Sequence, residues 1–330
     1  MIMKRLLTTI LSTIMLMTLA QAQSVGKLDV KVDGYTHNKF SHAPKKIFIQ
    51  HFNVNYQMVM VSYAQARGGT TYGSAESTLA LGLDGLEADR LQAITDKYYA
   101  EFTSKLESAG YSIMTPSEVK QSPYFADAEE IPGGSPKIDA IARGYVTSTP
   151  TNFVTLDVKN SIFNLGGEKE SKELGGIIVA RVSITIPFAE SQETNGGLVG
   201  GVAKIVAKAD LRISPNEAVP TKSDFKKPTM IGSDITFMYK ESLKWQAFYQ
   251  YELKKAIEIE DVMDEDKKYK AVSVGESAYR HPNELWIAGN YSANAIPIEV
   301  DAEKYYKGVD EAIGLYLISA VDGFIEKSKD

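Results

Sequence analysis

The chain contains no cysteine among its 330 residues, and this absence limits what it can fold into. A disulfide framework, a thiol nucleophile and a lipid-modified cysteine are all excluded. The folded state must therefore be held together by the burial of apolar side chains. A chain of this length is long enough to bury one large core or two modest ones.

The first 22 residues have the three-part pattern of an export signal. Lys4 and Arg5 form a basic start, Leu6 to Leu19 form an apolar run, and Ala20-Gln21-Ala22 is a small-x-small cleavage site. The apolar run is shorter than the roughly 20 residues that span a bilayer, which disfavours a transmembrane anchor. We therefore expect a mature protein that begins at Gln23, is periplasmic or secreted, and is not anchored in a membrane.

The charge balance narrows the class of partner. The formal net charge of −6 falls to −8 when Lys4 and Arg5 leave with the signal. An excess of negative charge disfavours nucleic acid or an anionic membrane as the main partner. The partners that stay open are another protein, a glycan or a small molecule, and the sequence also leaves open a homo-oligomer.

Composition divides the mature chain into three parts. Residues 23–43 form a polar leader that suits a mobile segment or the edge of a sheet. Residues 44–213 have the pattern of an α/β domain, and residues 214–330 add strands and a helix that either form a second domain or complete the first. The polar stretch from Ser214 to Pro228 holds three prolines and marks the candidate boundary.

Two long helices are predicted from apolar stripes at helical spacing. The first runs from about Leu86 to Ala109 and ends at Gly110, which suits the left-handed residue after a helix. Its charged face offers Lys97–Glu101 and Glu101–Lys105 pairs at i,i+4. The second is the C-terminal helix, from about Asp301 to Lys327. A capping box at Thr115–Glu118 predicts a short helix between them.

Alternating and buried apolar runs predict the strands. Two of these, Gly176 to Phe188 and Val202 to Ile213, flank a glycine-bearing segment and predict a long antiparallel hairpin. Polar residues at alternate positions predict that one face of this hairpin is solvated; they are Arg181, Ser183, Lys204 and Lys208. The other predicted strands are 46–54, 56–63 (continuing the first as one bent strand or a hairpin), 111–114, 138–147, 152–158, 235–239 and 245–251. Residues 67–85, with five glycines, are predicted to be a long loop for binding or disorder. The fold class is thus α/β of the α+β kind: a mixed sheet with two or three packed helices, a long antiparallel hairpin and a C-terminal helix.

The block from Ala93 to Val146 resembles an envelope-protein pattern. A helix ending in Leu106-Glu-Ser-Ala-Gly110, the strand Tyr111–Met114, the capped Thr115–Val119 and the stretch Ile138–Val146 occur in order. This order is similar to the α/β domain shared by the TolB amino-terminal region and the curli-transport CsgG group. The chain departs from both, since it lacks the lipidated cysteine of CsgG relatives and the propeller repeat of TolB relatives. The resemblance covers about half of the mature chain and implies a non-enzymatic envelope module.

Motifs that would indicate a reaction are weak in this chain. Of the four histidines, His37, His42 and His51 lie within fifteen residues of one another and His281 lies far away, but their spacing fits no known metal motif. No metal site and no cofactor are therefore predicted. Gly275–Tyr279 fails as a nucleophile elbow because tyrosine replaces the second glycine. Gly196–Gly201 is more typical of a hairpin tip than of a phosphate loop.

Two other functional classes stay open. Clustered carboxylates such as Asp127, Glu129 and Glu130 would be the acid and base of a secreted hydrolase if the fold held them across a sugar. The 176–213 hairpin, with its polar and apolar faces, would suit an oligomeric, membrane-inserting protein. Enzymatic activity is thus undecided, and a binding or assembly module is favoured.

Aromatic residues are the most suggestive surplus. The chain has 18 tyrosines, 12 phenylalanines and two tryptophans, and many lie in the last third. Tyrosine and tryptophan are favoured at interfaces and on carbohydrate-binding surfaces because they join an apolar body to a polar tip. The predicted ligand-binding residues are Tyr239, Trp245, Tyr249, Tyr251, Tyr279 and Trp286. The alternative is an aromatic core beneath the final helix.

Overall fold

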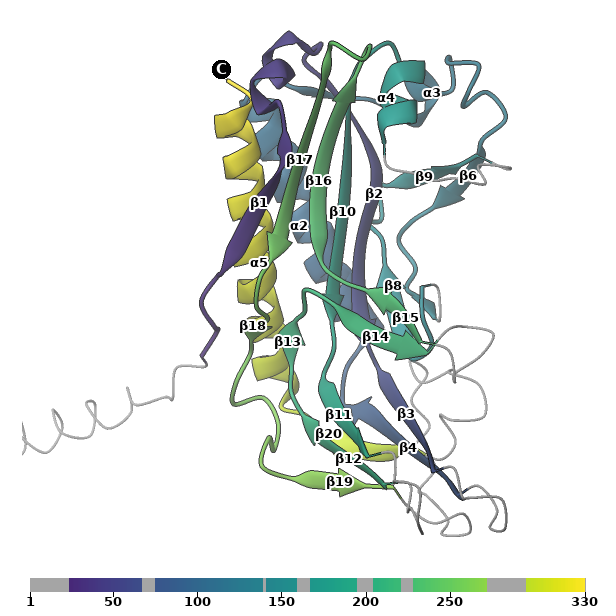
Figure 1. The fold of residues 1–330 in the computed structure, drawn as a ribbon, viewed down its shortest axis with the longest axis vertical. Coiled ribbons are helices and arrows are strands. Elements are labelled where there is room, and N and C mark those ends of the chain that lie inside the picture. Colours follow the sequence, from purple (N-terminus) through teal and green to yellow (C-terminus); the bar gives the residue numbers. More distant parts are fainter. Residues whose placement is uncertain are drawn as a thin grey trace, which may run out of the picture.

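A computed structural model describes residues 24–66, 75–138, 141–158, 167–194, 204–220, 228–271 and 295–329. In this part of the chain an eight-stranded mixed sheet forms the centre, in the order β1-β17-β16-β10-β2-β8-β7 with β5 beside β2 (Figure 1). Its strands are β1 (Val30–Tyr35), β2 (Lys46–Gln57), β5 (Ser112–Ile113), β7 (Lys137–Ile138), β8 (Tyr145–Ser148), β10 (Ile178–Ile186), β16 (Asp234–Lys240) and β17 (Gln246–Leu253). Strand β2 is parallel to β10 and to β5, and the other neighbours are antiparallel. The predicted α+β class is confirmed.

Two long helices cover one face of the central sheet. Helix α2 (Ala88–Ser108) and helix α5 (Ala302–Lys327) lie side by side there (Figure 1). Their predicted apolar stripes are buried, with Phe102 on α2 and Phe324 on α5 both fully inaccessible. Gly110 follows α2 with a φ of 88°, as predicted. The core of the molecule therefore lies between this helix pair and the sheet.

Shorter helices lie at one end of the molecule. Helix α3 (Pro116–Val119) begins with the predicted capping box, in which Thr115 and Glu118 bond each other's backbone N–H. Helix α4 (Glu168–Glu173) covers the opposite face of the sheet, where Val119, Phe125 and Val179 form a small second core. We call this opposite face of the sheet, away from α2 and α5, the outer face.

The ion pairs predicted within α2 are replaced by pairs between the two long helices. Lys97 contacts Asp310 at 2.7 Å and Lys105 contacts Asp322 at 2.6 Å, both across to α5. The ion pairs predicted within α2 were wrong because Asp310 and Asp322 of the neighbouring helix α5 lie within reach of the same two lysines.

The polar leader is an ordered edge of the central sheet. Strand β1 pairs with β17, and the 3₁₀ helix η1 (His37–His42) follows it. Phe40 of η1 is fully buried against Phe324, with ring centroids 5.2 Å apart. Of the two predicted states, an edge segment is the one that forms.

Strand β2 bends into a smaller sheet at the lower end of the molecule. After Met58 the chain continues as β3 (Val59–Ala66), which pairs with β4 (Ala75–Asp84), and β4 pairs with β20 (Ile296–Glu299). The predicted loop 67–85 is thus wrong for residues 75–84, where Leu79, Leu81 and Leu83 alternate toward the core. Residues 67–74 lie outside the described residues.

The long hairpin exists but is shifted along the chain. Strand β11 (Ala189–Thr194) pairs with β12 (Lys204–Ala209), and β12 pairs with β19 (Lys268–Lys270). Backbone bonds continue the hairpin inward, from Asp210 to Phe188 and from Ser214 to Thr185. Most of the predicted first strand is instead β10, which lies between β2 and β16 because parallel pairing with β2 buries both of its faces.

The remaining strands link the C-terminal part to the same body. Strand β13 (Arg212–Ile213) pairs with β18 (Ile257–Glu258), β14 (Glu217–Pro220) with β15 (Pro228–Ile231), and β6 (Glu129–Pro132) with β9 (Val154–Asp157). Because β16 bonds to β10 and α5 packs beside α2, residues after 214 complete the central sheet and its helix layer. Among the described helices, none is long and apolar enough to span a membrane.

Candidate functional site

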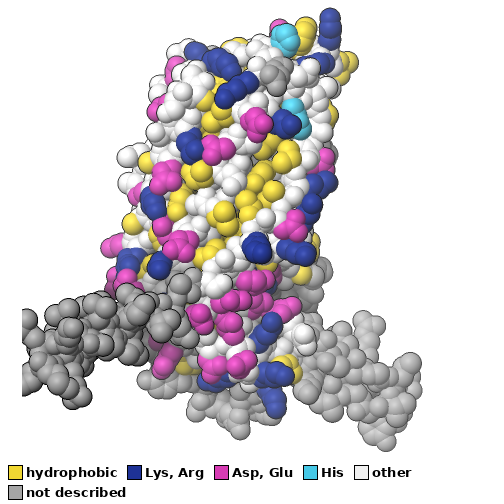
Figure 2. All heavy atoms as spheres, turned by 90° about the vertical axis from the view of Figure 1, so that its left-hand side faces the viewer, with side chains coloured by type: hydrophobic (Ala, Val, Ile, Leu, Met, Phe, Trp, Pro, Cys, Tyr) yellow, Lys and Arg dark blue, Asp and Glu magenta, His cyan; other side chains and the backbone are white. Residues whose placement is uncertain are grey.

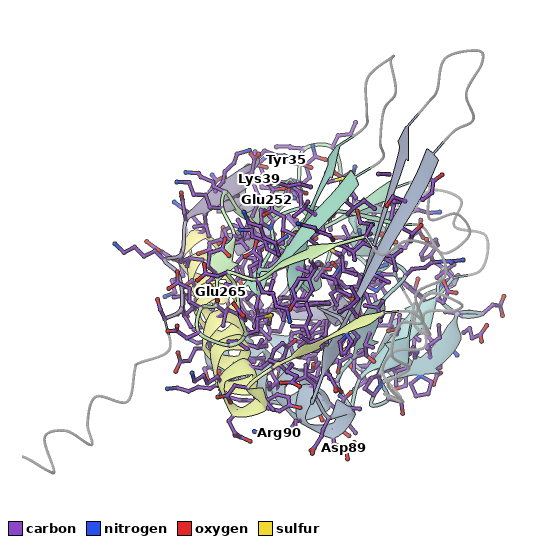
Figure 3. The ribbon with its side chains drawn as sticks, turned by 90° about the horizontal axis from the view of Figure 1, so that it is seen from below. Tyr35, Lys39, Asp89, Arg90, Glu252 and Glu265 are labelled. Carbon is purple, nitrogen blue, oxygen red and sulfur yellow. The ribbon has the colours of Figure 1, made fainter. Side chains whose placement is uncertain are left out.

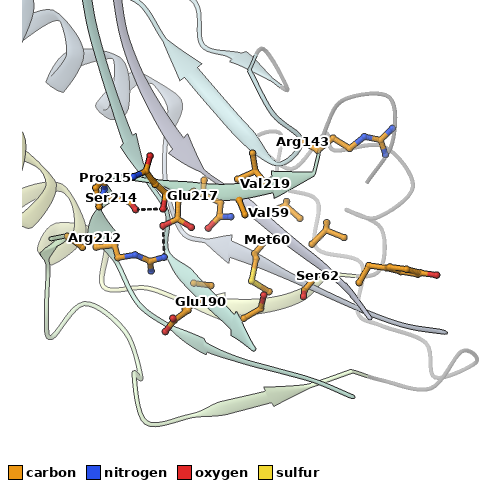
Figure 4. Close-up of a pocket in the computed structure, with 18 residues that line it drawn as sticks. Val59, Met60, Ser62, Arg143, Glu190, Arg212, Ser214, Pro215, Glu217 and Val219 are labelled. Carbon is orange, nitrogen blue, oxygen red and sulfur yellow. Dashed lines mark hydrogen bonds and ion pairs between the residues drawn. The ribbon is translucent and has the colours of Figure 1, made fainter. Parts of the chain in front are cut away.

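A pocket of about 640 Å³ opens where the central sheet meets the small sheets at the lower end (Figure 4). Three runs of consecutive residues form its walls: 59–63 from β3, 189–191 from β11, and 214–219 around β14. Adjacent residues of a strand point to opposite faces, so a wall of consecutive residues exposes the edge of the strand. The pocket is therefore lined by strand edges as well as by side chains.

Backbone hydrogen bonds show which groups face the pocket. Leu83 N–H donates to Met58 C=O at 2.9 Å, so this carbonyl points toward β4, whereas Val59 N–H points away from β4 and donates to Gly144 C=O at 3.0 Å. Because this direction alternates in an antiparallel pair, the N–H and C=O of Val61 point away from β4. The bond from Asp210 N–H to Phe188 C=O likewise turns the backbone of Ala189 and Ser191 away from β12. Small side chains along these edges leave room for a polar ligand beside the backbone.

Arg212 is the buried charge at one end of the pocket, and only 8% of the residue is exposed. Its Nη2 donates to Glu217 Oε1 at 2.7 Å, and its Nη1 lies 2.9 Å from Asp210 Oδ2. Burial alone would lower the pKa of Arg212, but the carboxylates of Glu217 and Asp210 raise it above its usual value. The guanidinium is thus held charged and rigid by two counter-ions.

A further carboxylate, Glu258, lies behind Arg212, in an adjoining cavity of about 440 Å³. Glu258 faces Arg212 across the β13–β18 pair. Burial, together with a hydrogen bond to Asp210 and its charge, raises the pKa of Glu258 to about 7, against the opposing effect of Arg212. Glu258 therefore changes its protonation state near neutral pH, beside the charge that shapes the pocket.

The far end of the pocket carries a second arginine. Arg143 and Arg212 lie at opposite ends, with Val59 and Met60 between them (Figure 4). Glu190 is exposed at the rim of the pocket near Arg212, and its Oε2 lies 3.5 Å from Lys208 Nζ. An elongated pocket with apolar residues between two charged ends suits a ligand that has both a backbone-like polar chain and apolar groups.

Three of the predicted ligand-binding residues belong to the core. Tyr239, Tyr249 and Tyr251 are at most 5% exposed. The Tyr249 hydroxyl donates to Ala320 C=O of α5 at 3.2 Å, so the polar tip is satisfied within the fold. The prediction that these three form a binding face was wrong, since all three are buried. Tyr249 and Tyr251 pack against α5, which is the alternative that the sequence left open.

The other predicted aromatic residues lie elsewhere. Trp245 is half-buried in the turn between β16 and β17, with the His42 ring 4.4 Å away. Tyr279 and Trp286 lie outside the described residues. The structure thus does not bring the four described members of the predicted set together at one surface.

The three histidines in the described part of the chain do not converge either. His37 packs against Tyr249, His42 packs against Trp245, and His51 lies on β2 beside Arg181 of β10. His281 lies outside the described residues. Within the described ranges, no group of three or more histidine and acidic side chains has a metal-binding arrangement.

The carboxylates considered for hydrolysis are solvated. Glu129 and Glu130 are both exposed on β6. Because they are adjacent residues of one strand, their side chains project to opposite faces. Glu130 pairs with Lys120 at 3.0 Å. With their side chains on opposite faces, these two residues cannot flank one substrate together.

The predicted solvated face of the hairpin is only partly correct. Lys208 is exposed on β12, but Arg181 lies on β10 with only 18% of its side chain exposed. Arg181 Nε donates to Gln50 Oε1 at 2.6 Å, and Nη2 lies 3.9 Å from Glu170 Oε1. The prediction was wrong for Arg181 because α4 and the neighbouring strands cover this part of the outer face.

The pocket residues were missed by the sequence interpretation. One signal was present: Arg212 interrupts the apolar run Leu211-Arg-Ile213, with Asp210 before it and Glu217 after it. A buried arginine needs carboxylate partners, so this spacing could have indicated a paired charge at the end of a strand. Comparison with protein families, curated proteins and solved structures finds no match for this chain.

Proposed function

We propose that the protein is an exported module of the cell envelope that binds or helps to assemble other envelope proteins without catalysing a reaction. The pocket between β3, β11 and β14 is its binding site, and its ligand is an extended segment of a partner protein. The observation that carries this proposal is that consecutive residues of β3, of β11 and around β14 line the pocket, so that strand edges face it. The export pattern of residues 1–22 and the resemblance of residues 93–146 to envelope proteins support the location.

An extended segment would bind by adding a strand to β3. The outward N–H and C=O of Val61 offer main-chain hydrogen bonds, and the pockets beside them offer places for alternate side chains. In the described part of the chain β3 is an edge strand of its sheet, and so is β11 of the neighbouring one. Unpaired strand edges attract further strands, which makes them suited to binding when a pocket restricts access.

The charges of the site suit binding better than hydrolysis. Arg212 is already paired with Glu217 and Asp210, and Arg143 lies at the other end of the pocket. Paired charges position a ligand and select its sequence, whereas a nucleophile or base must be left able to react. The site therefore favours recognition.

The test replaces the outward N–H of Val61 by proline. Proline is tolerated at an edge position whose N–H does not bond within the sheet, so V61P removes a donor from the pocket without breaking the β3–β4 ladder. The matched control is V32P on β1, because the bond from Lys254 N–H to Asp29 C=O turns the Val32 backbone away from β17. Both variants change one outward N–H on an edge strand.

The probe is a library of random peptides displayed on phage and selected on the chain from Gln23. We expect selected peptides to lose about tenfold or more in affinity for V61P and to bind V32P as they bind the unchanged protein. Failure to select any peptide, or equal affinity for V61P and V32P, would sink the proposal. Thermal unfolding of both variants checks that they fold.

A second candidate function is an oligomer that inserts into a membrane through its hairpins. The hairpins β3–β4 and β11–β12 extend from the same end of the molecule (Figures 1 and 3). A shared direction would let both act together in one assembly. Against this, Leu81 of β4 and Ile205 of β12 are fully buried in one core cluster.

A further inference from the structure

The turn between β16 and β17 carries the most exposed large apolar side chain in the described part of the chain. Leu243 is 86% exposed, compared with 62% for Met230 and 38% for Leu315. Glu241 N–H and Ser242 N–H both donate to Trp245 C=O, at 2.9 and 3.2 Å. These bonds close the turn and hold Leu243 at its apex. A single exposed leucine is ordinary on a protein surface, so its surroundings decide its meaning.

The surroundings of Leu243 are aromatic and cationic. Trp245 is half-buried next to it, and the side-chain nitrogens of Lys39 and Lys244 lie 5.6 and 5.3 Å from the centre of its ring. The Lys39 ammonium also donates to Lys244 C=O, which fixes η1 to the turn. We call residues 37–45 together with residues 241–245 the tip.

The tip has a net charge opposite to that of the whole chain. It holds three lysines, Lys39, Lys45 and Lys244, and one carboxylate, Glu241, whereas the whole chain has a net charge of −6. Acidic side chains gather toward the other end of the molecule, around Asp210, Glu258, Glu260 and Glu265, as Figure 2 shows for one face. The negative net charge disfavours attraction of the whole molecule to an anionic surface, but this asymmetry would turn the tip toward one.

We propose that the tip docks on the surface of a lipid bilayer that contains anionic phospholipid. Leu243 enters the boundary between headgroups and acyl chains, Trp245 lies at the depth of the headgroups, and Lys39 and Lys244 contact lipid phosphates. Tryptophan is favoured at that depth, and lysines near an anionic leaflet contribute additively to binding. The contact is peripheral, because one apolar residue and a few lysines give reversible attachment.

The experiment is sedimentation of the chain from Gln23 with vesicles. Phosphatidylcholine vesicles with about 30 mol % phosphatidylglycerol are compared with pure phosphatidylcholine vesicles, at about 0.05 M and about 0.5 M salt. The test variants are L243D and K244E. The matched controls are M230D, another exposed apolar residue, and K255E, which makes the same charge change near the far end of β17.

We expect binding to the anionic vesicles only, and weaker binding at the higher salt. L243D should weaken it by about tenfold or more and K244E by about fivefold, with M230D and K255E within about twofold of the unchanged protein. Absence of binding to anionic vesicles overturns the proposal and would assign the tip to a protein partner instead. Equal losses in L243D and M230D overturn it as well. Neither outcome bears on the pocket, which lies at the opposite end.

Discussion

Gly144 is the residue on which the junction between β2 and β3 depends. Its carbonyl accepts the N–H groups of Met58 at 2.7 Å and Val59 at 3.0 Å, where the chain passes from the central sheet to the small one. Its φ is 77°, and a Cβ there would lie 1.9 Å from Val59 C=O. Only a glycine allows this approach of two backbones, and the same junction forms one wall of the pocket.

We expect G144A to destabilise the protein by more than about 3 kcal/mol, because it adds a collision with backbone to the strain of a positive φ. G110A is the matched control. Gly110 has a φ of 88°, and a Cβ added there would meet nothing within 4 Å, so its replacement should cost only about 1–2 kcal/mol. Urea unfolding measures both free energies, and similar losses for the two variants would contradict the collision.

Two half-buried titratable groups on the outer face have pKa values shifted in opposite directions. Burial raises the pKa of Asp234 from 3.8 to about 6, with Arg181 opposing and Glu252 adding to the shift. Burial lowers the pKa of His51 from 6.5 to about 4, assisted by Arg181 and opposed by Asp157. Both residues are therefore held toward their neutral forms. The sheet face they share penalises charge of either sign.

The two groups should affect stability in opposite directions. Folded Asp234 keeps a proton that the unfolded chain releases, so its stabilising contribution is full below pH 4 and is lost as the pH rises to 6. Folded His51 rejects a proton that the unfolded chain takes up, so its contribution is full above pH 6.5 and is lost as the pH falls to 4. Relative to the unchanged protein, D234N should gain roughly 2 kcal/mol between pH 4 and pH 7, and H51Q should lose a similar amount. Urea unfolding across this range tests both, and curves parallel to that of the unchanged protein would contradict the assignment.

At the scale of elements, the docking of α5 depends on its apolar stripe. The ring of Phe324 stacks on Phe237 with centroids 3.7 Å apart, and Phe324 is fully buried. By contrast, the Lys105–Asp322 pair joins side chains that are 37% and 57% exposed. Solvent screens such a pair, so the ion pairs between α2 and α5 set alignment more than stability.

We expect F324A to lower the free energy of unfolding by about 3–5 kcal/mol and K105E by less than about 1 kcal/mol. The double variant K105E/D322K restores opposite charges and should recover most of the smaller loss. Urea unfolding at low and high salt measures these effects. A loss for K105E as large as that for F324A would show that charge, and not burial, holds α5 in place.

Helices and strands were predictable from the sequence to different degrees. The apolar stripes of α2 and α5 repeat over several turns, and two local signals were also correct: Gly110 marked the end of α2, and the capping box Thr115–Glu118 marked the start of α3. Strand β4 was missed because five glycines in 67–85 obscured the alternation of Leu79, Leu81 and Leu83. The predicted pairing of residues 176–188 with residues 202–213 was wrong for β10, which pairs with β2 and β16. A strand that is apolar on both faces could pair with several others, so its sequence alone does not determine its neighbour.

At the scale of the whole molecule, the pocket could not be read from the sequence. Its walls come from β3, β11 and β14. Strand β3 is separated from each of the other two by more than 100 residues of sequence. The aromatic residues misled the interpretation for a related reason. The hydroxyl groups of Tyr249 and Tyr316 donate hydrogen bonds to backbone carbonyls inside the fold, so these amphipathic side chains can be buried in the core. Composition cannot distinguish the two outcomes, because both use the same residues.

The hairpins at the lower end determine which oligomeric state we expect. Leu81 of β4 and Ile205 of β12 belong to the same buried cluster, and the β11–β12 hairpin contacts the β3–β4 hairpin, so the two hairpins bury apolar surface together within one chain. Insertion into a membrane or pairing with a second copy would first have to separate them and expose that surface, at about 25 cal/mol per Å². We therefore expect light scattering after size-exclusion chromatography to give the mass of a single chain from Gln23, in buffer and in mild detergent alike. A defined larger assembly that forms in detergent would contradict this and favour the membrane-inserting candidate, because detergent would then be replacing the contact between the hairpins.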